Sequence, residues 1–87
     1  MQDPQNKWFD IWFDDRTSVL ETMIRNMAAD LKAGFNFHGP TIQRQIREID
    51  EFKARFDSDM EHIKYLDDEK KVSRFCYYDL KKRGAIA

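Results

Sequence analysis

The chain of 87 residues is poor in cysteine, glycine and proline, and it lacks the alternating pattern of β-strands. Its single cysteine, Cys76, excludes an internal disulfide. Its 3 glycines and 2 prolines occur only near the chain ends and in one internal segment, residues 34–40. The β-branched residues are scattered singly, without the alternation of apolar and polar residues that is typical of a half-buried strand. These absences favour an all-α protein.

Long hydrophobic runs are also missing. The densest apolar stretch, from Trp8 to Phe13, includes Asp10 and is far shorter than the roughly 18 residues that a membrane-spanning helix needs. Asp10, Asp14 and Asp15 flank its aromatic residues, where binding to a membrane surface would require lysines. The first residues, from Met1 to Pro4, lack the basic and apolar regions of a secretory signal peptide. We therefore expect a cytoplasmic protein that has no membrane partner.

Neither sign of charge is in excess. The 15 basic and 16 acidic residues give a formal net charge of −1, so no overall field draws the chain to nucleic acid. Charged residues make up 36% of the chain, against about 25% on average, which suits helices with a large solvated surface. A domain of this size buries only roughly 60–65% of the surface of its unfolded chain. We expect one small helical domain, residues 1–87, completed by dimerisation.

The glycines and prolines that are present place one clear turn between two helical arms. Gly34 suits the positive φ that ends a helix, and Pro40 suits a first helical position. This pattern predicts a helical hairpin whose loop is at residues 34–39. Two interpretations of the first arm, from about residue 4 to 33, remain open. It is one helix, or it is broken near residues 14–18. Asp15 and Arg16 project into the apolar sector of this arm, and Ser18 and Glu21 have the spacing of a capping box.

The second arm, from about residue 40 to 66, carries a seven-residue repeat. Its apolar residues lie at alternating spacings of four and three residues. They are Ile42, Ile46, Ile49, Phe56, Met60 and Ile63. A strict heptad predicts a coiled-coil-like helix with left-handed supercoiling. Lys53 occupies one position of the repeat where an apolar residue is expected.

A third helix is predicted from about residue 68 to 83. It begins after a pair of aspartates and ends with three cations before Gly84, as the helix dipole favours. The sequence does not decide whether this helix continues from the second arm or folds back onto the hairpin. If it folds back, it covers one side of the first arm.

Four aromatic residues lie within six positions of the first arm: Trp8, Phe9, Trp12 and Phe13. Together with Ile11 they span an arc of about 200° around a helix, twice the width that one neighbouring element covers. Two interpretations remain open. The cluster forms the core under the third helix, or it is a partner interface, because aromatic residues concentrate at interface hot spots. We take these four residues as the candidate interface.

The stretch from Lys70 to Arg83 gathers cations against a single acid, Asp79. The cations are Lys70, Lys71, Arg74, Lys81, Lys82 and Arg83. Interleaved with them are Phe75, Tyr77 and Tyr78. Lysine and arginine contact phosphates and aromatic rings stack on bases, so this stretch is a candidate nucleic-acid contact. Cations at the end of a helix also have a purely local explanation, and no helix-turn-helix precedes them.

Patterns for catalysis, metals and cofactors are missing. Asp59 and His62 are three residues apart, like one carboxylate–histidine pair of a di-metal site. Such a site needs two of these pairs, and the sequence contains one. Cys76 has no matching base in a catalytic pattern, and no glycine-rich phosphate loop is present. We predict a non-enzymatic module without metal, cofactor or small-molecule substrate, which acts as a homodimer in protein–protein contacts with a structural or regulatory role. The alternative is a small DNA- or RNA-binding accessory protein.

Overall fold

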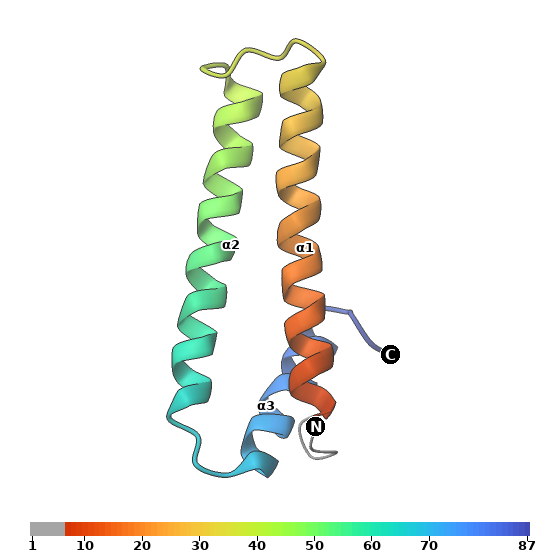
Figure 1. Cartoon of the computed structure of the whole chain (residues 1–87), viewed down its shortest axis with the longest axis vertical. Helices are drawn as coiled ribbons and strands as arrows, with labels where there is room; N and C mark the ends of the chain where they lie inside the picture. Colours follow the sequence, from red (N-terminus) through yellow and green to blue (C-terminus); the bar gives the residue numbers. More distant parts are fainter. Residues whose placement is uncertain (1–6) are drawn as a thin grey trace.

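The computed structural model describes residues 7–87, of which 80% are helical, with no strand among them. It has three helices, α1 (Lys7–Lys32), α2 (Pro40–Lys64) and α3 (Glu69–Lys82). α1 and α2 form an antiparallel hairpin, and α3 folds back to pack against the N-terminal half of α1 (Figure 1). The all-α prediction is confirmed. The predicted start of the first helix, near residue 4, lies outside the described residues.

α1 is one continuous helix, so the unbroken interpretation of the first arm is the one that the structure has. The polar residues that suggested a break, Asp15 and Arg16, remain helical because they find charged partners on other helices. Thr17 also stays inside the helix, where its Oγ1 donates to the carbonyl oxygen of Phe13 at 2.9 Å. The capping-box spacing therefore has no role here.

The loop at the tip of the hairpin begins with a glycine that no other residue replaces without strain. Gly34 has a φ of 104°. Its N–H donates to the Leu31 carbonyl at 3.1 Å, while Phe35 N–H donates to the Asp30 carbonyl at 3.0 Å. This pair of bonds is a Schellman motif, which satisfies the last carbonyls of α1. Pro40 then begins α2.

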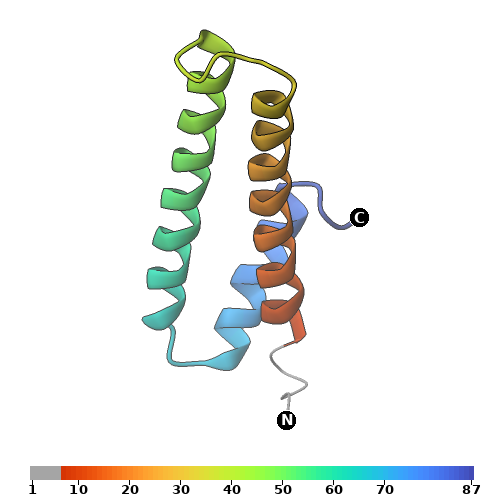
Figure 2. The ribbon, with the colours of Figure 1, turned by 45° about the horizontal axis from the view of Figure 1, so that its top comes forward.

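The turn into α3 is fixed by a side-chain cap. Asp68 accepts a hydrogen bond of 2.9 Å from the backbone N–H of Lys70. A carboxylate at this position satisfies one of the free N–H groups of the first turn and interacts favourably with the helix dipole. A second Schellman motif, at Gly84 with a φ of 76°, ends α3. The chain reverses between α2 and α3, as Figure 2 shows.

The core lies at the end of the hairpin where all three helices meet. Trp12, Phe56, Cys76 and Leu80 form it, with the rings of Trp12 and Phe56 edge to face at 5.6 Å between centroids. Beyond α3 the hairpin is a two-helix arm, and Ile42 is its fully buried apolar residue. The radius of gyration is 15.9 Å, against about 12 Å for a compact domain of this length. The molecule is therefore elongated.

Candidate interaction surfaces

Arg16 is a buried charge that joins the three helices. Its side chain is 2% exposed, and its Nη1 donates to Asp59 of α2 at 2.8 Å and to Asp79 of α3 at 3.2 Å. The guanidinium also lies over the rings of Trp12 and Phe56, at 5.3 and 5.2 Å from their centroids. A buried cation needs such pairing to offset the loss of its hydration. In the sequence, the position of Arg16 within the apolar sector of the first arm suggested a break in the helix. It did not reveal that Arg16 is buried in an ion pair.

Asp79 is the acceptor at the centre of this network. Besides Arg16, it accepts hydrogen bonds from Trp12 Nε1 at 2.7 Å and from Arg83 Nε at 2.9 Å. Burial acts to raise the pKa of Asp79, but the Trp12 hydrogen bond and the hydrogen bond and charge of Arg83, with the charge of Arg16, outweigh it. The pKa is consequently lowered, and Asp79 stays ionised at neutral pH.

The four aromatic residues of the first arm have different surroundings. Trp12 is fully buried in the core of this chain. Trp8 is half-buried against the Tyr77 ring at 4.9 Å, and Phe9 is half-buried between Trp12 and Phe13. Phe13 remains 38% exposed. Of the four candidate interface residues, Phe13 is therefore the most exposed, although its ring also lies 5.6 Å from that of Phe56.

An apolar stripe continues from Phe13 along α1. Leu20, Ile24 and Leu31 follow at spacings of seven, four and seven residues, which place them on one side of the helix. At about 100° per residue, this side lies about 160° around α1 from Asp15, which pairs with Arg83 beyond α3. Ile24 is 45% exposed.

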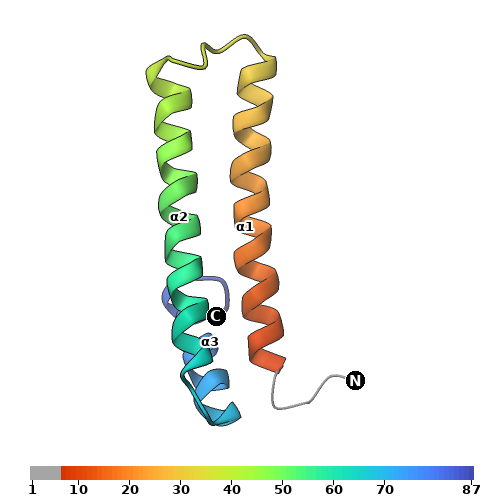
Figure 3. The ribbon, with the colours of Figure 1, turned by 60° about the vertical axis from the view of Figure 1, so that its left-hand side comes forward.

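The neighbouring side of α2 extends this stripe. Ile46 is half-buried and lies about 140° around α2 from Asp59, which faces α3. Figures 2 and 3 show α3 on one side of the hairpin only, so no other described element covers the opposite side. We call this side the open face and define it by Phe13, Leu20, Ile24, Leu31 and Ile46.

The predicted cations of the third helix divide into two groups. Arg83 turns inward, with its Nη2 at 2.6 Å from Asp15 and its Nε at 2.9 Å from Asp79. The others are exposed at the surface of α3. They are Lys70, Lys71, Arg74, Lys81 and Lys82. Among the described residues, the ion pairs that the structure contains involve none of these five.

The residues weighed for metal binding and nucleophilic chemistry are separated or buried. Asp59 is bound to Arg16, whereas His62 is exposed with its ring at 5.0 Å from that of Phe75. Burial, with the negative charges of Asp79 and Asp59, raises the pKa of the Cys76 thiol to about 12. Within residues 7–87 no group of three or more histidine, cysteine, aspartate and glutamate side chains is placed to hold a metal ion.

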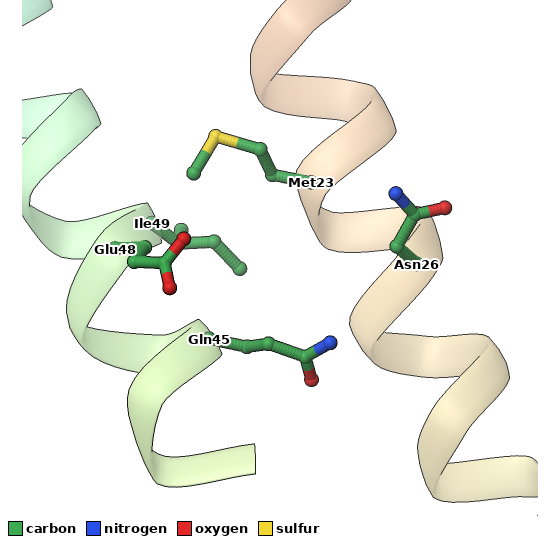
Figure 4. A pocket seen from close by; sticks show the side chains of 5 residues that line it. All are labelled: Met23, Asn26, Gln45, Glu48 and Ile49. Atoms are coloured by element: carbon green, nitrogen blue, oxygen red, sulfur yellow. The ribbon is translucent and has the colours of Figure 1, made fainter. Parts of the chain in front are cut away.

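A small pocket opens between the two arms above α3 (Figure 4). Its volume is about 130 Å³, and its walls are Met23, Asn26, Gln45, Glu48 and Ile49. Gln45 Nε2 donates to Asp30 at 2.8 Å, and its Oε1 is buried without a partner. A space of this size, with polar walls at Asn26, Gln45 and Glu48, is large enough for water molecules. The sequence did not predict this pocket, because Gln45 belongs to no recognisable motif.

Comparison of the chain with protein-family models, with curated proteins and with solved structures finds no match. In residues 7–87, no helix combines the length and apolar character that crossing a membrane requires. The function is therefore inferred from the surfaces of this chain.

Proposed function

We propose that the protein is a non-enzymatic interaction module that forms a homodimer through the open face. One observation carries this proposal: the apolar stripe of α1, with Ile46 of α2 beside it, continues along the hairpin on the side that α3 does not cover. Phe13 and Ile24 are 38% and 45% exposed there. Exposed apolar surface of this continuity is typical of a protein–protein contact.

The dimensions of the open face suit a second copy of the same hairpin. From Phe13 to Leu31 it extends about 27 Å at a rise of about 1.5 Å per residue, and two helices are about 20 Å wide. Two such faces bury roughly 1,000 Å² in total, which reaches the lower limit for a stable interface. Two hairpins packed in this way form a four-helix bundle.

Charges of α2 beside Ile46 favour a defined register over random association. Lys53, seven residues after Ile46, is exposed, and its Nζ lies 3.2 Å from Asp57. A charged residue in an otherwise apolar seam stabilises only those alignments that leave it paired or solvated. A discrete dimer is therefore expected rather than open-ended aggregation.

Light scattering coupled to size exclusion tests this proposal at micromolar concentration. The chain has a mass of 10.5 kDa, so we expect the wild type at about twice that value. Ile24→Glu places a charge in the open face and is expected to give a monomer. Arg25→Glu is the matched control, because Arg25 is exposed on the neighbouring position of α1 and leaves the face intact. A wild type that elutes as a monomer, or an Arg25→Glu variant that dissociates equally, would refute the dimer.

A further inference from the structure

The outer side of α3 carries a surface that the open face does not explain. Lys71, Arg74, Tyr78 and Lys82 are spaced by three, four and four residues, so they lie on one side of the helix. This side points away from the core, because Leu80, two residues from Tyr78, is fully buried. Tyr78 is 62% exposed at its centre.

Three shallow depressions surround the Tyr78 ring, and each combines an aromatic wall with a cation. The first has Trp8 and Tyr77 beside Arg74, with a volume of about 330 Å³. The second has Phe75 beside Lys71 and Arg74, with a volume of about 330 Å³. The third has Phe75 beside Lys82 and Arg55 of α2, with a volume of about 290 Å³. We call Arg55, Lys71, Arg74 and Lys82, with Tyr78 between them, the cationic face.

The acids next to the cationic face do not neutralise it. Asp59 and Asp79 line the third depression, but Asp59 is paired with Arg16, and Asp79 is paired with Arg16 and Arg83. Among the described residues, the ion pairs involve none of the four cations of the face. The positive charge is therefore available to an anionic partner.

We infer that the cationic face binds single-stranded nucleic acid. A flat base stacks on an exposed aromatic ring, and the flanking lysines and arginines meet the phosphates. From Lys71 to Lys82 the face extends about 16 Å along the helix, the length of about five stacked nucleotides at about 3.4 Å each. The ring of Tyr78 is reached by an unpaired base, whereas the bases of a duplex are already stacked on each other.

The geometry of α3 disfavours duplex reading. One side of α3 is packed against α1 and the core, so the helix is not free to enter a major groove as a recognition helix does. An acidic peptide or an anionic vesicle supplies negative charge without a flat base that stacks on the Tyr78 ring. This inference does not rest on dimerisation, because α3 and the open face lie on different sides of the hairpin.

Fluorescence anisotropy with labelled 12-mers of oligo-dT and oligo-rU tests the inference on the whole chain. Four phosphate contacts predict a salt slope of about −3, so binding is expected to weaken about 50-fold between 50 and 200 mM salt. The triple variant Lys71→Gln, Arg74→Gln, Lys82→Gln is expected to lower the magnitude of that slope to about 1. Its control removes three exposed cations elsewhere, with Arg25→Gln, Lys32→Gln and Arg47→Gln.

A tyrosine pair separates stacking from charge. Tyr78→Ala is expected to weaken binding about 5- to 100-fold, whereas Tyr65→Ala, at a tyrosine that is 80% exposed, leaves binding unchanged. The inference is overturned if neither oligomer binds at 50 mM salt or if a 12-mer duplex binds more tightly. It is equally overturned if the two tyrosine variants behave alike, or if polyglutamate or anionic vesicles compete as well as unlabelled oligomer.

Discussion

Trp12 and Asp79, 67 residues apart in the chain, are joined by a hydrogen bond of 2.7 Å from the indole Nε1 to Oδ2. The same carboxylate oxygen accepts from Arg16 and from Arg83. One carboxylate of α3 thus accepts from the buried indole and from the buried guanidinium of α1, which also donates to Asp59 of α2. These bonds tie α3 to the N-terminal half of α1.

Removing Asp79 is expected to destabilise the fold much more than removing Asp15. Asp79→Ala leaves the Trp12 indole without its acceptor and removes one of the two carboxylates that pair with the buried Arg16, which costs about 3 kcal/mol in the free energy of unfolding. Asp15→Ala breaks only the ion pair with Arg83, which is partly exposed at 28% and 26% of the two side chains, and costs under about 1 kcal/mol. Urea denaturation of both variants measures the difference. Equal losses would show that the buried network does not hold α3.

Acid is expected to weaken the contribution of Asp79. The pKa of Asp79 in the folded state is below the ordinary value of 3.8, so the unfolded chain takes up the proton first as the pH falls. Its stabilisation is therefore complete above about pH 5 and is lost through pH 4 toward the lower folded pKa. Urea denaturation from pH 7 to pH 3 checks this. The stability difference between wild type and Asp79→Asn should shrink below pH 4, and a constant difference contradicts the lowered pKa.

Cys76 is expected to resist alkylation while the protein is folded. The thiolate is the reactive form, and burial together with the charges of Asp79 and Asp59 raises the thiol pKa to about 12. At pH 8 iodoacetamide should modify the unfolded chain in urea at an ordinary rate and the native protein at least about 100-fold more slowly. Mass spectrometry over time measures both rates. Rapid modification of the native protein would place Cys76 outside the core.

Gly34→Ala is expected to destabilise the hairpin without a steric clash. The position has a φ of 104°, and an added Cβ meets nothing within 4 Å, so the cost is backbone strain of about 1–2 kcal/mol. Gly34→Asn should cost less, because asparagine tolerates positive φ better than alanine. Urea denaturation ranks the two variants. Wild-type stability in Gly34→Ala would indicate that the loop adopts another conformation.

The helices and the turn could be predicted from the sequence because their determinants are local. Gly34 and Pro40 act through their own backbone preferences, and Asp68 caps a helix two residues away. The lack of β-branched alternation had already indicated an all-α protein. Each of these signals is complete within one or two turns of chain.

The surfaces could be predicted only in part. The sequence indicated an aromatic cluster too wide for one neighbouring helix and a third helix rich in cations. It did not show which residues of each group are buried and which are exposed. In the structure Trp12 is core and Phe13 is exposed, while Arg83 turns inward and Arg74 stays at the surface. Arg55 joins the cationic face from α2, which no local pattern links to α3.

The sequence by itself determined where the hairpin turn lies, where the two helices after it begin, and which residues are apolar. The tertiary structure alone decided that α3 folds back, which side of α1 it covers, and hence which side is left as the open face. That choice depends on contacts such as those from Arg16 to Asp59 and Asp79, 43 and 63 residues away. Helical periodicity repeats within a few residues, whereas the pairing of buried charges exists only once the three helices meet.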